Sequence, residues 1–307
     1  MLKFILKRMF EAIPTLLVLI TLSFFLMRFA PGNPFSSERA LPPQVMANIN
    51  AKYGLDKPVS QQYFTYLTNI IVKGDFGPSF KYQDRSVNEL IRNAFPVSAK
   101  IGLAAFVFTV LLGVGVGTVA ALKQNSWIDY SLMALSMFGV VIPSFVLAPL
   151  LMFVFSISMH WFPAGGWKDG SWQYMALPVV AMSMMYVAAF ARITRSAMIE
   201  VMHSPFIRTA RSKGLSRTYI VIKHALRPAL LPVVSYMGPA FVGIITGSVV
   251  VETIFGLPGI GKLFVNAAFN RDYSLVMGVT ILIGLLFIVF NAVVDILLAY
   301  IDPKIRY

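Results

Sequence analysis

Residues 101–122 read IGLAAFVFTVLLGVGVGTVAAL, a stretch without a single charged side chain. An uncharged run of about 18 residues or more can cross the hydrocarbon core of a bilayer as a helix, because each residue adds about 1.5 Å. Lipid offers no partners to backbone N–H and C=O groups, so a spanning segment of this kind satisfies them within its own helix. The stretch therefore predicts a membrane protein built from helices.

Five further apolar runs predict an all-α polytopic membrane protein with about six transmembrane helices. These runs cover residues 12–27, 130–159, 170–191, 228–251 and 273–294. The first has no small-x-small cleavage site after it, so we expect a retained helix and not a signal peptide. Pro143 and Pro149 predict a kink or break in the run 130–159, because proline removes a backbone hydrogen bond.

Glycine spacing inside two of the runs predicts close packing between helices. Gly113, Gly115 and Gly117 lie in one run, and Gly243 and Gly247 lie in another. Small residues at such spacing let helix backbones approach closely in lipid. We therefore expect these faces to pack against neighbouring helices.

Composition agrees with a membrane protein and excludes several other classes. Hydrophobic residues make up 57% of the chain, charged residues 13%, and the mean hydropathy is +0.73. The net charge of +13 comes from Lys and Arg clustered between the apolar runs, which argues against a nucleic-acid-binding surface. Because the chain has no cysteine, disulfides and thiolate metal sites are excluded.

The positions of Lys and Arg predict that both termini are cytoplasmic. With this orientation the inner segments hold fourteen of these residues and the short outer loops hold three, Lys168, Lys262 and Arg271. Such a bias toward the inner side is typical of cytoplasmic loops. The predicted division is a first transmembrane helix (1–28), an extracytoplasmic helical insert (29–97) and a five-helix core (98–307) with a cytoplasmic loop at 192–228.

Within the insert, two patterns mark helix ends. Pro58 precedes a helical run that closes at Gly74, and residues 86–89 read Ser-Val-Asn-Glu, a capping box. The insert is also too long for a simple connector. We expect it to stabilise the first two spans or to contact an extracytoplasmic protein.

The cytoplasmic loop contains a short basic helix with clear end signals. Ser204 and Pro205 suit its first turn, Arg211 and Lys213 suit the negative end of its dipole, and Gly214 suits its C-cap. A second helix should begin near Ser216 and end before Pro228. A helix of two to three turns is not stable alone in water, so we expect a contact to hold the first one.

An apolar face on this first helix predicts a docking element. Phe206, Ile207, Ala210 and Gly214 follow three- and four-residue spacing, and Arg208, Arg211 and Lys213 lie around them. A short amphipathic helix of this kind suits a groove on a partner protein.

Four motifs together resemble the permeases of ABC importers, in the branch that transports peptides. The loop resembles their EAA motif, which reads Glu-Ala-Ala, three residues and Gly. This chain has Arg208-Thr209-Ala210 in place of the triplet before Gly214, so only the second Ala is kept. The other three motifs are residues 224–228 (HALRP), 74–77 (GDFG) and 252–261 (ETIFGLPGIG).

The resemblance implies a fold, partners and a coupling site. It implies the ABC-importer permease fold in the bacterial inner membrane, working with a second permease subunit, two cytoplasmic ATPase subunits and an extracytoplasmic peptide-binding protein. ATP and Mg²⁺ would belong to the ATPases, with no cofactor on this chain and no catalytic residue. The helix that would seat in an ATPase groove comprises Phe206, Ile207, Arg208, Thr209, Ala210, Arg211, Ser212, Lys213 and Gly214.

A second candidate site lies after the fifth run. Glu252, Gly256, Pro258 and Gly259 are candidates for an outer gate or substrate path, with Glu252 facing a peptide amine. The alternative is a structural role for Glu252 near the membrane boundary and a simple turn for the glycines. Residues 256–263 nearly match a P-loop, but Leu263 replaces the Ser or Thr that would hold Mg²⁺.

Other candidate sites are weaker. Glu11 and Asp295 lie near predicted helix ends, where snorkelling or a local ion pair explains them. His160, His203 and His224 are far apart and form no metal-binding spacing, so no metal site is predicted.

Two other functional classes remain as alternatives. A self-sufficient secondary transporter or channel would usually carry ionisable residues or broken helices at mid-membrane, and the predicted span centres carry no charge. A membrane enzyme would need a catalytic constellation, and none of the common motifs is present. The sequence does not distinguish oligopeptides from dipeptides, nickel chelates or sugars as the substrate.

Overall fold

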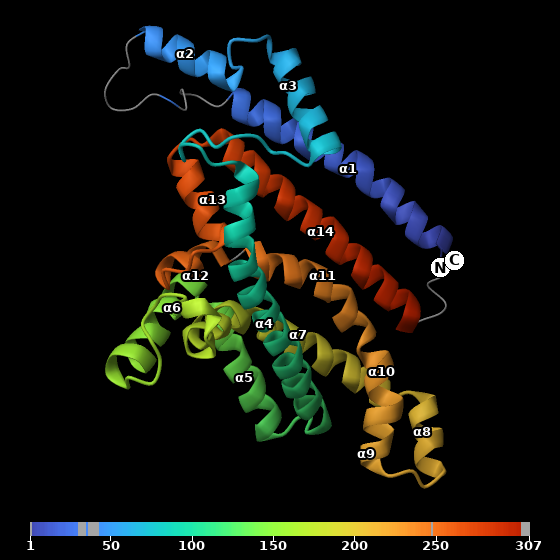
Figure 1. Cartoon of the computed structure of the whole chain (residues 1–307). Coiled ribbons are helices and arrows are strands. Elements are labelled where there is room, and N and C mark those ends of the chain that lie inside the picture. Colours follow the sequence, from blue (N-terminus) through green and yellow to red (C-terminus); the bar gives the residue numbers. More distant parts are fainter. Residues whose placement is uncertain (1, 30–34, 36–42, 247, 302–307) are drawn as a thin grey trace.

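The computed structural model describes residues 2–29, 35, 43–246 and 248–301, and these are helical nearly throughout (Figure 1). Within them the only extended pairing is an isolated bridge between Pro78 and Ser86. In chain order the elements are α1 (Leu2–Phe29), α2 (Pro43–Tyr53), α3 (Val59–Thr68), η1 (Asn69–Lys73), α4 (Val87–Leu122), α5 (Trp127–Val141), α6 (Ser144–Leu151), η2 (Met152–Ser158), η3 (Lys168–Gly170), α7 (Trp172–Met202), α8 (Pro205–Ser212), α9 (Arg217–Tyr219), η4 (Ile220–Ala225), α10 (Leu226–Ala229), α11 (Leu231–Thr246), α12 (Ser248–Ile254), α13 (Ile260–Phe269) and α14 (Tyr273–Ile301).

The described residues contain five helical segments that are long and apolar enough to cross a membrane, and a sixth that is broken. The five are α1 from Phe10, α4, α7, the segment Leu231–Ile254 and α14. The sixth consists of α5 and α6–η2, which are bent by 105°. The break falls at Ile142 and Pro143, where both residues have extended or polyproline backbone angles. The prediction of about six spans agrees with these five continuous candidates and one broken candidate, and the predicted break at Pro143 is confirmed.

Several helices are longer than the sequence predicts. The N-cap half of the capping box is confirmed, since the Ser86 hydroxyl accepts a hydrogen bond from the Glu89 N–H at 3.1 Å, while the Glu89 carboxylate pairs with Arg85. It opens α4 at Val87, so the boundary placed at residue 97 falls inside this helix. At the other end of the core α7 continues to Met202, well into the segment predicted as a cytoplasmic loop.

Close packing of α4 on α7 depends on two of the predicted glycines. A Cβ added at Gly113 would lie 2.5 Å from Phe190 Cβ, and one added at Gly117 would lie 2.6 Å from Thr194 Cβ. Gly115 meets nothing within 4 Å, so the prediction for this residue is wrong. It lies two residues from each of the others, and positions two apart face different directions on a helix.

In the second glycine pair, Gly243 packs closely against the Tyr186 side chain, so the prediction for this residue is confirmed. Gly247 lies outside the described residues.

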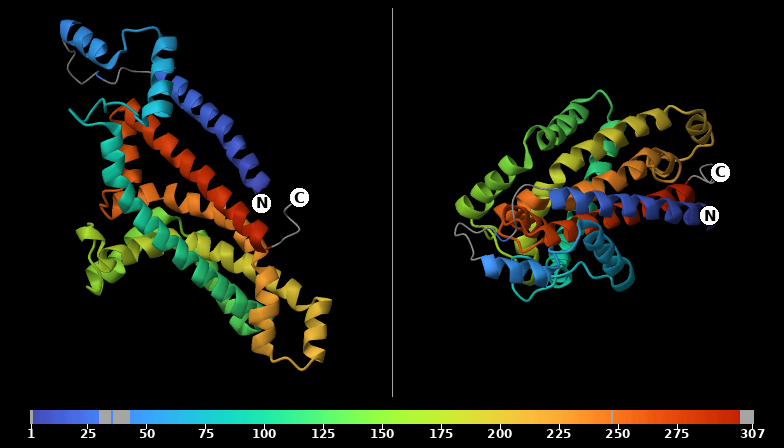
Figure 2. Two further views of the ribbon diagram at one scale, coloured as in Figure 1. Left: turned by 45° about the vertical axis from the view of Figure 1, so that its right-hand side comes forward. Right: turned by 90° about the horizontal axis from the view of Figure 1, so that it is seen from above.

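The helices place two groups of elements at opposite ends of the molecule. The start of α1, the end of α14 and the hairpin of α8 and α9 lie at one end (Figures 1 and 2). The insert helices α2 and α3, together with α13, lie toward the other end. This arrangement agrees with an even number of spans and with a basic hairpin on the same side as both termini.

Candidate functional site

Helix α8 begins and ends where the sequence predicts. Ser204 has extended backbone angles, Pro205 is the first helical residue, and Gly214 has a φ of +73°. The Gly214 N–H donates to Arg211 O at 2.9 Å and the Leu215 N–H to Ala210 O at 3.4 Å, which is the hydrogen-bond pattern of a Schellman motif. One detail differs: the Ser204 hydroxyl donates to Val201 O at 2.6 Å and does not cap α8.

The chain itself holds α8 in place. Ile207 is fully buried and Ala210 nearly so, in a cluster with Met198 of α7 and with Ile220 and Ala225 of η4. The contact that was expected to hold so short a helix therefore lies within this chain and does not require another protein. The predicted apolar face of α8 is confirmed, but η4, the second helical segment of the hairpin, covers part of it. Residue spacing in the sequence predicts an apolar face but not the neighbour that covers it.

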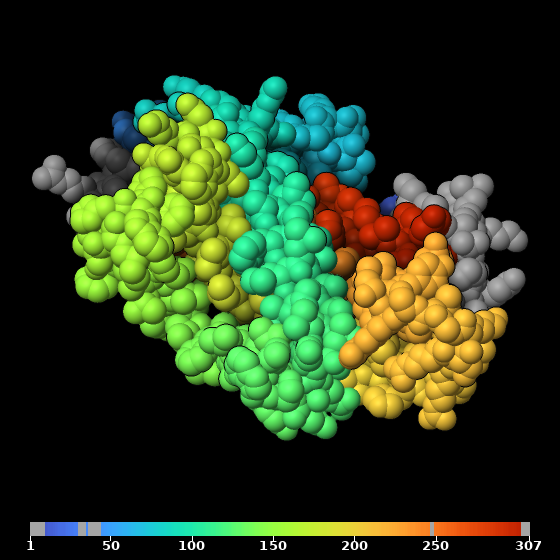
Figure 3. All heavy atoms as spheres, turned by 90° about the horizontal axis from the view of Figure 1, so that it is seen from below, coloured from blue at the N-terminus to red at the C-terminus, as the bar shows by residue number. Residues whose placement is uncertain are grey.

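The remaining surface of α8 is exposed and basic. Phe206 is 49% exposed, and Arg208, Arg211 and Lys213 are all exposed. No carboxylate in the described part of the chain pairs with these three cations. Thr209, Ser212 and Gly214 are exposed as well, and α8 to α10 form a raised group at one edge of the molecule (Figure 3). This surface can bind an acidic groove on another protein.

The hairpin partner of α8 also begins as predicted. The Ser216 hydroxyl accepts from the Tyr219 N–H at 3.3 Å, which caps α9. The helical path then runs through η4 into α10 and includes Pro228, whereas the sequence predicts an end before this residue. Arg217 donates to Leu122 O at 3.0 Å and so ties the hairpin to the end of α4.

An ion pair that the sequence analysis missed joins α5 to α7 near the hairpin. Arg195 Nε and Nη2 donate to the two carboxylate oxygens of Asp129 at 2.6 and 2.7 Å. The Asp129 side chain is 1% exposed and also accepts from the Asn125 N–H at 3.0 Å. The capping spacing from Ser126 to Asp129 is visible in the sequence, but the distant arginine that Asp129 meets is not.

A cavity of about 120 Å³ lies beside the break between α5 and α6. Pro143 and Ser144 line it from the break, Met182 and Tyr186 from α7, and Gly243 from α11. It is mainly apolar, with hydroxyl groups from Ser144 and Tyr186. A broken span lined by such groups can offer a small, uncharged path through the membrane.

Glu252 is buried in a hydrogen-bonded network at the other end of the molecule. Its exposed fraction is 0%, Ser98 donates its hydroxyl hydrogen to Glu252 Oε1 at 2.5 Å, and the Lys262 N–H donates to Oε2 at 3.0 Å. The Ser98 oxygen in turn accepts from the Ile260 N–H at 2.8 Å. The carboxylate thus caps the N-terminus of α13 and links it to α4.

The other three predicted gate residues form the turn before α13. Gly256 and Pro258 are exposed, and Gly259 is buried against Glu252. A Cβ at Gly259 would lie 2.5 Å from both carboxylate oxygens, so this position needs glycine. The same carboxylate occupies the helix N-terminus to which a P-loop would bind phosphate.

Another buried carboxylate, Asp272, fastens the insert to α14 and was not predicted. Ser79 donates its hydroxyl hydrogen to Asp272, and the Phe80 N–H donates to Asp272 Oδ1 at 3.0 Å. The same oxygen accepts from the Leu275 N–H at 3.3 Å and caps α14. An Asp before a long apolar run is an N-cap signal that can be recognised in the sequence.

Two family models match the chain. The model described as "Binding-protein-dependent transport system inner membrane component" matches residues 113–307, and its N-terminal counterpart matches residues 1–102.

Curated relatives match over the full length. The chain is 66% identical to the oligopeptide transport system permease protein OppB of Haemophilus influenzae and to that of Escherichia coli K12, with all of each chain covered. It is 42% identical to the dipeptide transport system permease protein DppB of Bacillus subtilis, covering 100% of this chain and 98% of that protein.

Solved structures share the fold at low sequence identity. A chain of the MetNI methionine ABC transporter, in an inward-facing conformation, superposes with a TM-score of 0.58 and 16% identity, covering 70% of this chain and 97% of that one. A chain of an amino acid ABC transporter has a TM-score of 0.51 and 17% identity, covering 71% and 94%. These similarities confirm the predicted ABC-importer permease fold.

Proposed function

The chain belongs to the family of binding-protein-dependent transport system inner membrane components, and on that basis we propose that it is a pore subunit of an ATP-driven importer of peptides. The substrate class rests on the OppB relatives, which are 66% identical over the whole chain, compared with 42% for a dipeptide permease. Oligopeptides are the proposed substrate, taken up across the bacterial inner membrane.

The proposed assembly has four kinds of partner. A second permease subunit completes the pore, two cytoplasmic ATPase subunits bind ATP and Mg²⁺, and an extracytoplasmic protein delivers the peptide. This chain then needs no nucleotide site of its own. The insert that contains α2 and α3 is the proposed contact for the delivery protein, because it lies toward the end of the molecule away from α8 (Figure 2).

The observation that carries the coupling proposal is that the outer side of α8 is exposed and basic, while its inner side is buried against the rest of the chain. Phe206, Arg208 and Arg211 face outward, while Ile207 is packed against Met198 of α7. When the ATPases close on ATP, a pull on α8 reaches α7 through this packing and α5 through the Arg195–Asp129 pair. Packed helices switch between discrete arrangements, so the helices rotate as rigid bodies. The cavity beside Pro143 then opens to one side of the membrane in one arrangement and to the other side in the other.

The proposed substrate path runs along the cavity beside Pro143, where the span is broken. Glu252 supports the outer end of this path by fixing α13 and does not touch the peptide, since both of its oxygens accept hydrogen bonds inside the protein. Gly256 and Pro258 remain candidates for the outer gate, because their turn is exposed.

Charge reversal on α8 tests the coupling. We expect the double variant Arg208→Glu/Arg211→Glu to lower uptake of labelled oligopeptides about tenfold or more, because like charges across an interface cost several kcal/mol. The ATPase subunits should no longer co-purify with the variant. The measurements are uptake by a strain whose own copy is replaced, and a pull-down of the assembled complex.

The control is Lys123→Glu, which reverses an exposed cation near the hairpin but off α8. It should retain uptake and co-purification. Full uptake by the α8 double variant, at an equal amount in the membrane, would contradict the coupling role.

A strain lacking the chain should lose uptake of peptides of graded length. Unchanged peptide uptake in this strain would contradict the substrate class.

A further inference from the structure

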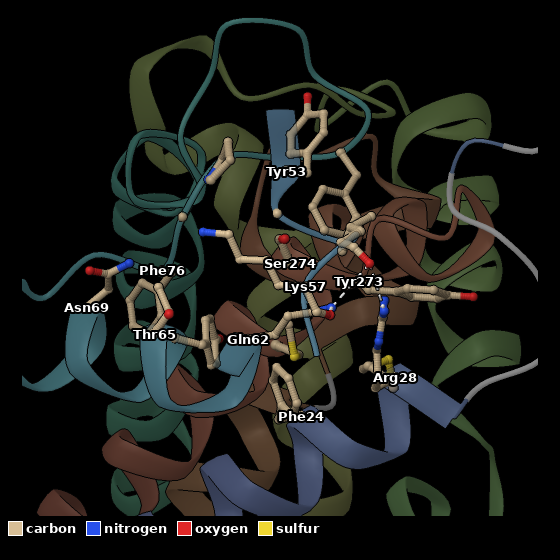
Figure 4. A pocket seen from close by; sticks show the side chains of 18 residues that line it. Phe24, Arg28, Tyr53, Lys57, Gln62, Thr65, Asn69, Phe76, Tyr273 and Ser274 are labelled. Carbon is tan, nitrogen blue, oxygen red and sulfur yellow. Dashed lines mark hydrogen bonds between the residues drawn. The ribbon is translucent and has the colours of Figure 1, made fainter. Parts of the chain in front are cut away.

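A cavity of about 200 Å³ lies between the insert and the ends of two membrane helices. Figure 4 shows Phe24 and Arg28 of α1, Gln62 and Thr65 of α3, and Tyr273 of α14 around this space. It is separate from α8, from the cavity at Pro143 and from Glu252.

The cavity is cationic. Arg28 and Lys57 line it, and no Asp or Glu is among the lining residues. To the described residues Arg28 makes one hydrogen bond, from Nη2 to Leu55 O at 3.3 Å, and neither Arg28 nor Lys57 pairs with a carboxylate among them. A partly enclosed space with two cations and no carboxylate among its lining residues favours an anion.

A buried hydroxyl group in the lining also lacks a partner. The Tyr66 Oη is buried and makes no hydrogen bond to any described residue. Burial raises the pKa of Tyr66 above its usual range, so the phenol remains a hydrogen-bond donor at neutral pH. A buried donor without an acceptor is costly, and an oxygen atom of a bound anion would satisfy it.

The cavity lies at the boundary between membrane and water. Arg28 is in the last turn of α1, and just before it the same helix exposes Leu22 by 57% and Leu26 by 65%. Aromatic residues gather there: the ring of Phe25 stacks on that of Tyr63 with centroids 5.5 Å apart. Aromatic and basic residues at a helix end are typical of the level of lipid headgroups.

We propose that this cavity binds the anionic headgroup of a phospholipid from the leaflet that borders the insert. Arg28 and Lys57 contact the phosphate, and Tyr66 donates to one of its oxygens. The acyl chains lie along the exposed apolar side of α1. The proposal does not depend on the transported substrate.

The geometry favours a lipid over a free anion or a peptide carboxylate. Phe24, Met27 and Met277 provide apolar walls next to the cations, which suit a glycerol backbone and the first methylene groups. The exposed apolar side of α1 then continues for several turns and can accompany a chain, which neither a phosphate ion nor a short peptide would use.

Native mass spectrometry of the purified full-length chain tests the proposal. We expect phosphatidylglycerol to be retained about tenfold more than phosphatidylcholine, and the double variant Arg28→Gln/Lys57→Gln to lose this preference. The matched control Lys73→Gln/Lys81→Gln removes two exposed cations of the insert that do not line the cavity, and should keep it. Equal retention of the two lipids, or an unchanged preference in the first double variant, would overturn the proposal.

A milder variant covers the case in which loss of two cations disturbs folding. Tyr66→Phe removes only the hydroxyl and should weaken phosphatidylglycerol retention about threefold without lowering thermal stability. Unchanged retention would overturn the role of Tyr66.

Inorganic phosphate or a tripeptide should displace the lipid only at far higher concentration. Displacement by either at the concentration of the lipid itself would overturn the assignment to a lipid.

Discussion

At the scale of single residues, two of the fully buried carboxylates, Glu252 and Asp272, explain how loops are fixed at one end of the molecule. Glu252 and Asp272 each accept backbone N–H groups at the start of a helix, α13 and α14 respectively. Each also accepts a serine hydroxyl from a distant segment, Ser98 or Ser79. A buried carboxylate is stable only when its oxygens are satisfied in this way.

Replacing Glu252 by Gln should destabilise the protein without changing its shape. Both carboxylate oxygens accept hydrogen bonds, and an amide would turn a donor toward either Ser98 or the Lys262 N–H. We expect a loss of about 2 kcal/mol in the free energy of unfolding. The measurement is thermal unfolding of the purified chain in detergent.

The control for this change is Glu89→Gln, whose carboxylate is 48% exposed and pairs with Arg85 at 3.4 Å. An exposed pair of this kind contributes little, so the melting temperature should hardly change. If Glu252→Gln and Glu89→Gln have equal stability, the capping role of Glu252 is wrong.

At the scale of elements, α8 is packed against the rest of the chain and is not a free helix. Its buried side is held by η4 and α7, and its C-terminus is fixed by the left-handed Gly214. Only its outer side is available to another protein. The proposed docking helix is thus ordered without a partner, which would lower the entropic cost of binding one.

Gly214→Val should impair transport through the backbone alone. Nothing lies within 4 Å of a Cβ at this position, so a clash is not the cause. A β-branched residue at a φ of +73° costs about 1–2 kcal/mol and should unwind the end of α8. We expect peptide uptake to fall severalfold at an unchanged amount in the membrane.

Asn tolerates the left-handed region, so Gly214→Asn is the matched control and should retain most uptake. The ratio of ATP hydrolysis to uptake in the assembled complex measures coupling in both variants. Equal coupling in the Val and Asn variants would show that the left-handed end of α8 does not matter.

The Asp129–Arg195 pair should be the strongest single link between α5 and α7. Asp129→Asn leaves Arg195 facing a neutral amide in a largely buried setting and should cost about 3 kcal/mol of stability. The separate variant Arg195→Lys should keep only part of the stabilisation that the pair provides, because a lysine cannot donate two parallel hydrogen bonds. Thermal unfolding measures both, with the exposed Asp56→Asn as the control. No loss in Asp129→Asn would remove this pair from the coupling path.

At the scale of the whole molecule, the basic hairpin and the insert lie toward opposite ends (Figures 1 and 2). The count of Lys and Arg predicts that the hairpin end is cytoplasmic. In the proposed assembly, two events must then be connected over the length of the membrane helices: delivery of a peptide at one end and ATP-driven closure at the other. The long helices α4 and α7, packed tightly through Gly113 and Gly117, form the continuous connection.

The absence of cysteine makes this orientation directly testable. Single cysteines at Ser60 in α3 and at Ser212 in α8 would both be exposed. In intact cells a membrane-impermeant maleimide should label Ser60→Cys, while Ser212→Cys should react only after the inner membrane is opened. Labelling in the reverse order would contradict the orientation and, with it, the proposed ATPase contact.

The sequence alone determined the features that depend on local chemistry. Uncharged runs predicted the five continuous candidate spans and the broken one, Pro143 predicted the break, and Ser86, Pro205 and Gly214 predicted helix ends. Each of these follows from backbone hydrogen bonding or from the lack of water in lipid, so a short window of sequence is sufficient. The family motifs likewise identified the fold that the solved structures share.

Only the tertiary structure decided which distant side chains meet. It paired Asp129 with Arg195, turned Glu252 inward onto Ser98, fastened Asp272 to Ser79, and covered Ile207 within the chain. It also assembled the cationic cavity from α1, the insert and α14. These contacts depend on the relative rotation and depth of packed helices, and the sequence fixes the face of each helix but not the neighbour that this face meets.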